Sequence, residues 1–301
     1  MRSIRDKFKI RDFLFILDEA HWKLKHLTKV VRYQFRNVDE NVAVNSSDSE
    51  NTSYVNAVKK FNKSSKKNRR FRNEINYKFI LEHVKPSQGE KYLEEILSML
   101  DKREISLISE IIRQNDSYGK PRCSYYRFLG KSSPTTLRYL KIALEIKKLF
   151  GNIPNMTVSE LGIGYGGQAS IISKIMNIKK YYAYDIPEVC ILAKKYLEEI
   201  NNPMPIVFTE ITNPITQYPD LFLSNYAFSE LPENLQRRYL EKLICYSPRG
   251  YMIMNSGLTN ATNRSYGKMR FEEIKEYLPN ARIIDETPKT GIDNYVIIWG
   301  N

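Results

Sequence analysis

The fold of this chain is decided by the stretch ELGIGYGGQ, residues 160–168, together with YYAYD, residues 181–185. Apolar residues from Met156 to Leu161 predict a strand that runs directly into four glycines, and residues 167–178 then show the apolar spacing of a helix. Glycines are needed where a backbone turns sharply and approaches a ligand with no Cβ in the way. The N-terminus of the following helix offers unpaired N–H groups to that ligand. The stretch therefore predicts a ligand-binding strand–turn–helix unit.

Two classes of ligand are compatible with this turn. Gly162, Gly164 and Gly167 satisfy the G-x-G-x-x-G spacing of dinucleotide-binding enzymes. Glu160, however, places a carboxylate at the end of the strand, where it would crowd a diphosphate. Asp185 ends the next predicted strand, where a carboxylate can accept hydrogen bonds from ribose hydroxyls. The two acids favour a ribose-bearing ligand with a cationic amino-acid tail, and S-adenosylmethionine has both parts.

Strands and helices alternate after residue 155. Strands are expected at 156–161, 180–185, 204–211, 220–227, 249–256, 281–285 and 294–299, and helices at 135–150, 167–178, from 187, 232–246 and 271–278. Strands separated by helices indicate βαβ units and a parallel sheet covered on both faces. Only the last two strands lack a helix between them, so we expect an antiparallel pair there. The predicted fold class is α/β: a seven-strand, Rossmann-like sheet with helices on both faces and an antiparallel last strand.

The first 117 residues differ in composition from the rest. Residues 1–40 mix aromatic and aliphatic with basic residues, which predicts one or two amphipathic helices. Residues 43–73 are poor in large apolar groups, and the second half of this segment carries eight basic residues and no acid, so we expect it to be flexible. We therefore divide the chain into a mainly helical, basic N-terminal region, 1–117, and an α/β domain, 118–301.

The charge balance limits the classes of partner. The 301 residues include 47 Lys and Arg against 34 Asp and Glu, a net charge of +13, which favours anionic partners such as nucleic acid, an acidic membrane face or a phosphorylated substrate. A solvated basic surface explains the same excess more simply, so we expect no nucleic-acid partner and at most a peripheral membrane contact through the N-terminal region. The oligomeric state is left open.

Apolar runs and cysteines indicate the compartment. No run of apolar residues is long enough to cross a bilayer or to serve as a signal peptide. The three cysteines lie far apart and match no metal-ligand spacing. The sequence therefore predicts a cytoplasmic protein with reduced thiols and no metal site, at most peripheral to the inner membrane face.

Residues 118–301, about 60% of the chain, resemble class I, seven-strand S-adenosylmethionine-dependent methyltransferases. More narrowly, they resemble sugar O-methyltransferases of bacterial polysaccharide and antibiotic-sugar gene clusters. The matching stretches are GKPRCSYY, SSPTTLRY, SELGIGYGGQASII, YYAYDIPEVCILAKKYL, LFLSNYAFSEL and NYVIIWG. The resemblance implies that S-adenosylmethionine is the cofactor and that a sugar hydroxyl, on a glycan or on a nucleotide-linked or lipid-linked precursor, receives the methyl group.

The resemblance also implies which residues contact the cofactor. Asp185 would hold the ribose, and Ile186 would lie beside the adenine. The full set comprises the glycine turn and residues at strand ends: Glu160, Gly162, Gly164, Tyr165, Gly166, Gly167, Gln168, Asp185, Ile186, Glu210 and Asn225.

Methyl transfer to a hydroxyl requires alignment of the reactants and removal of the hydroxyl proton. Ligands of open α/β sheets bind at the carboxyl ends of the strands, so residues 224–230 should face the transferred methyl. We expect Glu230 to act as general base or to bind the acceptor hydroxyl, and Tyr226 to position the reactants. An acid stabilised by the dipole of the next helix explains Glu230 equally well. No histidine of 118–301 can act as base, because all three histidines precede that region: His21, His26 and His83.

Three further residues are candidates for substrate binding. Arg138 and Arg122 could bind a phosphate or carboxylate of the substrate, although an arginine that bridges two helices is as common. Asn255, at the end of a later strand, is a weaker candidate.

Other functions stay open at this stage. A methyltransferase acting on nucleic acid or another anionic substrate would suit the charge, but residues 224–227 lack the prolines of the Asn/Asp-Pro-Pro-aromatic loop common in N-methylating members. An NAD-dependent oxidoreductase would suit the glycine spacing, and the terminal strand pair argues against it. A cofactor-binding module without enzymatic activity is the third alternative.

Overall fold

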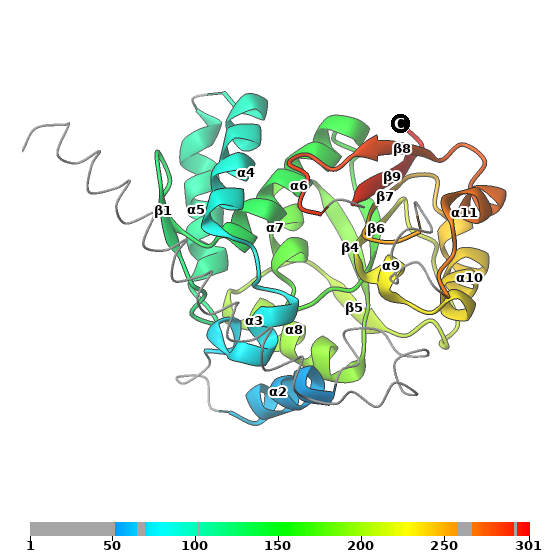
Figure 1. Ribbon diagram of the computed structural model, residues 1–301, viewed down its shortest axis with the longest axis horizontal. Helices are drawn as coiled ribbons and strands as arrows, with labels where there is room; N and C mark the ends of the chain where they lie inside the picture. The colour runs from blue at the N-terminus through cyan, green and yellow to red at the C-terminus, as the bar shows by residue number, and fades with distance from the viewer. Residues whose placement is uncertain (1–51, 65–69, 102, 258–266, 292–293) are drawn as a thin grey trace, which may run out of the picture.

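Seven strands form one mixed sheet in the order β5-β4-β3-β6-β7-β9-β8 in the computed structural model, which describes residues 52–64, 70–101, 103–257, 267–291 and 294–301 (Figure 1). The strands are β3 (Met156–Leu161), β4 (Ile178–Tyr184), β5 (Ile206–Thr209), β6 (Leu221–Asn225), β7 (Gly250–Met254), β8 (Arg282–Asp285) and β9 (Tyr295–Trp299). The first five are parallel, whereas β9 is antiparallel to both β7 and β8. The predicted fold class, with its antiparallel last pair, is confirmed.

Helices connect and cover these strands. Those after residue 118 are α6 (Pro134–Phe150), α7 (Gly167–Ile175), α8 (Pro187–Glu199), α9 (Ala227–Glu230), α10 (Glu233–Lys242), the 3₁₀ helix η4 (Ile244–Tyr246) and α11 (Phe271–Tyr277). Before residue 118 lie α2 (Thr52–Lys63), the 3₁₀ helix η3 (Phe71–Asn73), α3 (Ile75–Ile80), α4 (Pro86–Met99) and α5 (Glu104–Asp116). A small hairpin, β1 (Ser124–Tyr126) and β2 (Gly130–Ser132), separates α5 from α6.

Two hydrophobic clusters lie on opposite faces of the sheet, because side chains alternate along each strand. In β7, Tyr251 and Ile253 belong to the cluster that includes α4 to α8. Met252 and Met254 belong to the other cluster, with α10 and α11. The first cluster also contains α2, so the helices before residue 118 share a core with the sheet. The boundary at 117/118 stays a prediction.

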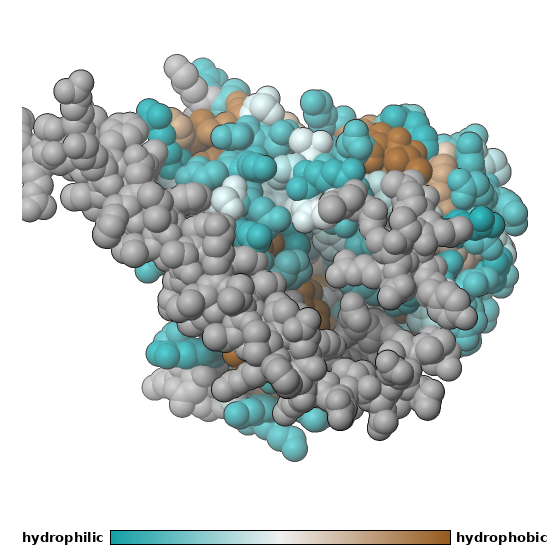
Figure 2. All heavy atoms as spheres, viewed as in Figure 1, coloured by the Kyte–Doolittle hydropathy of each residue, from teal (hydrophilic) through white to brown (hydrophobic). Residues whose placement is uncertain are grey.

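The described surface agrees with this burial pattern. The face shown in Figure 2 is mainly hydrophilic where residues are described, and hydrophobic residues form only small groups on it. No helix in the described ranges combines the length and the apolar character needed to cross a bilayer. The three cysteines are free thiols.

The prediction of a flexible segment over 43–73 was wrong for α2. Tyr54, Val58 and Phe61 are buried at helical spacing, while the lysines between and after them are exposed. The helix packs beside α8, and the Asn62 side-chain amide donates to the Glu188 carbonyl oxygen at 2.8 Å. Composition alone suggested flexibility because it counts charges and ignores their placement on one face. Residues 1–51 and 65–69, which include the predicted amphipathic helices of 1–40, lie outside the described residues.

A fully buried arginine joins the early helices to the sheet. Arg72, in η3, forms an ion pair with Glu82 and another with Asp116, the latter at 3.2 Å. The same guanidinium donates to the Thr136 hydroxyl of α6 at 3.2 Å and lies 4.6 Å from the ring centroid of Tyr165. Three segments distant in sequence therefore converge on one side chain.

Replacing Arg72 with Met should destabilise the protein strongly. The change leaves the carboxylates of Glu82 and Asp116 without their cation, and loss of one partner of a buried pair costs about 3–5 kcal/mol. Urea unfolding near pH 7 measures this loss. Arg113→Met is the matched control, since its pair with Glu110 is exposed and should contribute about 0–1 kcal/mol. A loss at Arg72 no larger than that at Arg113 would contradict the assignment.

Candidate active site

A cavity of about 580 Å³ opens where β3, β4 and β6 end. Most of the sequence-predicted site residues line it: Arg138, Glu160, Gly162, Gly164, Gln168, Asp185, Ile186, Glu210, Asn225, Tyr226, Glu230 and Asn255. Four others are not among its lining residues: Arg122, Tyr165, Gly166 and Gly167. Arg122 lines instead a small separate pocket beside Glu82. The carboxyl edge of the sheet thus brings together residues that the sequence spreads from 138 to 255.

The glycine turn has two sides with different roles. Gly162 has a φ of +86°, and a Cβ there would lie 2.3 Å from the Cβ of Ala227, so only glycine fits between the ends of β3 and β6. Gly166, with a φ of +88°, begins α7. Tyr165 is buried behind the turn, where its hydroxyl donates to Asn115 Oδ1 at 2.8 Å. Tyr165, Gly166 and Gly167 therefore shape the turn from behind, while Gly162 and Gly164 line the cavity.

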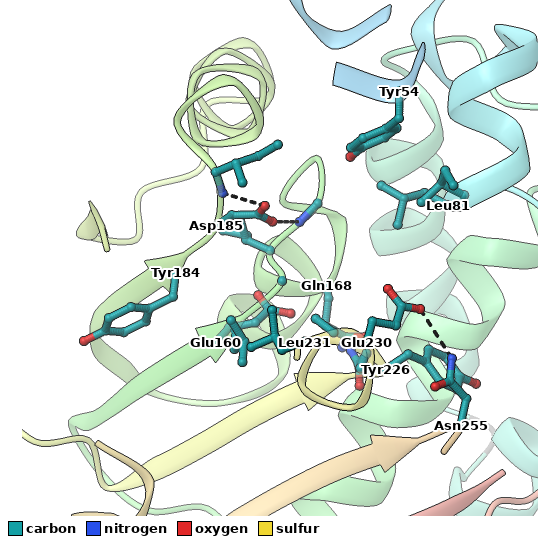
Figure 3. A pocket seen from close by; sticks show the side chains of 18 of the residues that line it. Tyr54, Leu81, Glu160, Gln168, Tyr184, Asp185, Tyr226, Glu230, Leu231 and Asn255 are labelled. Carbon is teal, nitrogen blue, oxygen red and sulfur yellow. Dashed lines mark hydrogen bonds between the residues drawn. The ribbon is translucent and has the colours of Figure 1, made fainter. Parts of the chain in front are cut away.

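Two carboxyl groups flank this turn (Figure 3). Glu160, only 1% exposed at the end of β3, accepts a hydrogen bond from the Tyr181 hydroxyl at 2.8 Å. Asp185, directly after β4, accepts from the backbone N–H of Gly164 at 3.1 Å and of Ile186 at 2.8 Å. These bonds hold both acids at the inner end of the cavity, one on each side of the turn.

Burial makes both acids hard to ionise. Burial, and to a smaller extent the charge of Asp185, raise the pKa of Glu160 to about 8 despite the hydrogen bond from Tyr181. Burial likewise raises the pKa of Asp185 to about 7, against the two backbone hydrogen bonds. A cation bound between them would favour the ionised forms. The pair is therefore suited to a positively charged ligand.

The side-chain amides of Gln168, in the first turn of α7, and Asn225, at the end of β6, line the next part of the cavity. Gln168 is buried; its Nε2 donates to the Tyr139 carbonyl oxygen at 3.0 Å, and its Oε1 accepts from Asn225 Nδ2 at 3.4 Å. Asn225 Oδ1 is buried and has no hydrogen-bond donor among the described residues. The amide of Asn225 is thus only half satisfied.

Tyr226 and Glu230 lie on the opposite side of the cavity from Asp185 (Figure 3). Tyr226 has a φ of +69°, rare for a residue with a side chain, and it caps α9. Its hydroxyl donates to Glu286, and burial together with the charge of Glu286 raises its pKa well above the usual value. Tyr226 therefore keeps its proton and is suited to positioning. Glu230 Oε1 accepts from Asn255 Nδ2 at 3.3 Å.

The N-terminal region supplies lining residues that the sequence analysis missed. They come from α2, from the turn between α3 and α4, and from α4: Tyr54, Leu81, His83, Val84 and Gln88. Tyr54 and Leu81 lie near each other on this wall (Figure 3), and Leu81 approaches the glycine turn, since a Cβ at Gly164 would lie 3.2 Å from Leu81 Cδ1. Their sequence offered no signal beyond helical spacing, because only the tertiary structure lays α2 and α3 over the carboxyl edge.

His83 requires a correction of the expectation about catalytic bases. No histidine lies within 118–301, yet His83 lines the cavity from outside that region. Its Nδ1 is 2.9 Å from the Ile80 carbonyl oxygen, and a carbonyl can only accept, so Nδ1 carries a proton. A residue that precedes the α/β domain in sequence can still line its cavity, so His83 is a candidate base.

No family model matches this chain, and no curated protein sequence matches it. The solved structures to which the chain shows similarity include an S-adenosylmethionine-dependent methyltransferase from Aquifex aeolicus, 17% identical, with a TM-score of 0.39 over 66% of this chain and 97% of that one. Magnesium protoporphyrin IX methyltransferase from Synechocystis PCC 6803, solved with bound S-adenosylmethionine, is 12% identical, with a TM-score of 0.40 over 66% and 96%. An O-methyltransferase family protein from Burkholderia thailandensis is 11% identical, with a TM-score of 0.37 over 55% and 57%.

Replacing Glu160 with Gln should flatten the pH dependence of stability in the ligand-free protein. A carboxyl whose pKa rises from 4.5 to about 8 on folding stabilises the fold fully only below its unfolded pKa, and that stability is lost as pH rises through the folded pKa. The unfolding free energy of the parent protein should therefore fall between about pH 5 and pH 8. In the variant this fall should be smaller by at least about 1 kcal/mol. Urea unfolding at several pH values measures this difference. The exposed Glu276→Gln serves as control, and an unchanged slope in Glu160→Gln would refute the burial of a titrating carboxyl.

Proposed function

We propose that this protein transfers a methyl group from S-adenosylmethionine to a hydroxyl group of a sugar. The observation that carries the proposal is the pair of carboxyl groups, Glu160 and Asp185, on either side of the glycine turn. Their raised pKa values mean that ionisation is unfavourable without a cation. A ligand with a positively charged amino-acid end and a ribose meets both requirements, whereas a diphosphate would be repelled.

The chain's own residues would hold this cofactor in an extended form across the sheet edge. Asp185 has both oxygens anchored by backbone N–H groups, and their remaining lone pairs are suited to two ribose hydroxyls. Ile186 and Glu210 lie beyond it, on the side proposed for the adenine. Glu160 and the half-satisfied amide of Asn225 are suited to the amino-acid end. When bound, the cofactor supplies an electrophilic methyl group on a sulfonium centre.

The side of the cavity near Tyr226 is suited to a hydroxyl-rich acceptor. Its lining includes amide and hydroxyl side chains that can both donate and accept: Gln88, Asn225, Asn255, Thr290 and Asn294. The sugar assignment combines this polar lining with the resemblance of 118–301 to sugar O-methyltransferases. A nucleic-acid acceptor has less support, because the described residues that line the cavity near Tyr226 present single polar groups and no row of basic side chains.

Two residues are candidates for removing the hydroxyl proton. Glu230 lines the cavity and is oriented by its hydrogen bond from Asn255. His83 also lines it, and because its Nδ1 donates to the Ile80 carbonyl oxygen, Nε2 is the ring nitrogen that would take the proton. Either group would act by taking the acceptor proton as the new bond forms. We retain Glu230 as the proposed base because Asn255 fixes its position from the end of β7.

Calorimetric titration with S-adenosylhomocysteine and with NAD tests the cofactor. We expect the first to bind and the second to fail. Asp185→Ala should weaken S-adenosylhomocysteine binding by about 1–3 kcal/mol through lost hydrogen bonds to a charged group. Glu276→Ala removes an exposed acid and should leave the affinity unchanged. NAD binding without S-adenosylhomocysteine binding would overturn the proposal.

Transfer of tritiated methyl from S-adenosylmethionine to monosaccharides, UDP-sugars and dTDP-sugars tests the acceptor. With any sugar that is methylated, Glu230→Gln should lower kcat by about 10²–10⁴-fold while S-adenosylhomocysteine affinity stays nearly unchanged. His83→Gln provides the comparison. If His83→Gln reduces kcat and Glu230→Gln does not, the histidine is the base. Methylation of a tRNA or DNA control with no sugar methylated would favour the nucleic-acid alternative.

A further inference from the structure

Arg138 is a buried cation that lines the cavity and forms no ion pair with any residue that the structure describes. It lies in α6, it is only 6% exposed, and it lines the cavity. Its guanidinium carbon lies 5.6 Å from the ring centroid of Tyr139 and 5.7 Å from that of Tyr226. Within the described residues, no hydrogen bond or ion pair involves this guanidinium. Its five N–H donors are therefore available on the cavity side.

Glu286 is near enough to interact electrostatically with Arg138, but its hydrogen bonds go elsewhere. It accepts from the Tyr226 hydroxyl, from the Thr290 backbone N–H at 2.8 Å and from Asn294 Nδ2 at 3.1 Å. These bonds hold the carboxylate at the hydroxyl of Tyr226. Arg138 is thus stabilised at a distance and is not neutralised by direct contact.

A buried guanidinium without hydrogen bonds is costly, so a charge in this place calls for a ligand that supplies acceptors. Its position indicates which part of the ligand that is. Asp185 follows β4, whereas Tyr226 follows β6, and β4 and β6 lie on opposite sides of β3. Arg138 therefore lies away from the proposed ribose site, next to the loop that should face the transferred methyl.

We propose that Arg138 binds a carboxylate carried by the acceptor, which makes the substrate an acidic sugar of the uronic acid class. The inference rests on the proposed function and adds the chemistry of its acceptor. A planar guanidinium fork matches a carboxylate in two parallel hydrogen bonds. Arg138 supplies one positive charge, and the negative charge of Glu286 interacts with it. The site is therefore suited to a ligand group with a single negative charge, and the second charge of a phosphate monoester would be left without a cation.

Binding of sugars to the protein loaded with S-adenosylhomocysteine tests the inference. The probes are D-glucuronate and D-galacturonate, with D-glucose and D-galactose as neutral counterparts and D-glucose 6-phosphate as the phosphate counterpart, followed by ligand-observed NMR. The uronates should bind at least about tenfold more tightly than their neutral counterparts, as a charge-assisted pair requires. The preference should disappear in Arg138→Met and survive in part in Arg138→Lys. Arg113→Met, with the same loss of charge on an exposed side chain, should retain it.

The outcomes separate this inference from the proposed function. Failure of the parent protein to bind S-adenosylhomocysteine would count against the proposed function itself. If S-adenosylhomocysteine binds but the uronates show no preference over neutral sugars, only the acidic acceptor is refuted. A preference for the phosphate sugar would refute the carboxylate. A tenfold loss of S-adenosylhomocysteine affinity in both Arg138 variants, with unchanged circular dichroism, would assign Arg138 to the carboxylate of the cofactor and overturn the inference.

Discussion

Arg72 lies fully buried between the early helices and the glycine turn, and the cavity's shape depends on it. Its ion pairs reach Glu82, before α4, and Asp116, at the end of α5. Its guanidinium also lies over the ring of Tyr165, the residue inside the turn itself. Because a buried cation must keep its acceptors, these segments cannot separate without leaving charges unpaired. The same contact thus positions the wall that carries Leu81 and His83 over the glycines.

Charge is distributed unevenly within the cavity that results. Two carboxyl groups lie beside the glycine turn, and burial raises the pKa of each. Arg138 lies on the other side of β3, beside the loop after β6. The ionised form of each group is unfavourable without a nearby opposite charge. The proposed cofactor would supply a positive charge at the carboxyl groups, and the proposed acceptor would supply a negative charge at Arg138. Such sites commonly combine low intrinsic stability with specific binding, since the charges that cost stability also select the ligand.

The predictions that were correct came mostly from patterns of adjacent residues. The errors concern features that depend on packing between segments distant in sequence. The glycine turn, the strand before it and the acid after the next strand were read from adjacent residues, and the structure places Glu160 and Asp185 together as that reading required. The segment 43–73 was predicted to be flexible from its composition. That prediction missed α2, because the helix depends on a few apolar residues such as Tyr54 and Phe61 in a segment rich in charged residues. His83 was excluded as a base because it precedes the α/β domain in sequence. The turn after α3 that carries it nevertheless lines the cavity.

The sequence by itself determined the alternation of strands and helices, the antiparallel last pair and the edge of the sheet where the cavity opens. Those features follow from the periodicity of apolar residues and from glycines in backbone conformations that other residues adopt only rarely. Only the tertiary structure decided that Tyr165 supports the turn from behind, that His83 reaches the cavity and that Arg138 has no hydrogen bond or ion pair within the part of the chain that the structure describes. These properties depend on which side chains from distant segments fill the space around a group, and no local pattern encodes that.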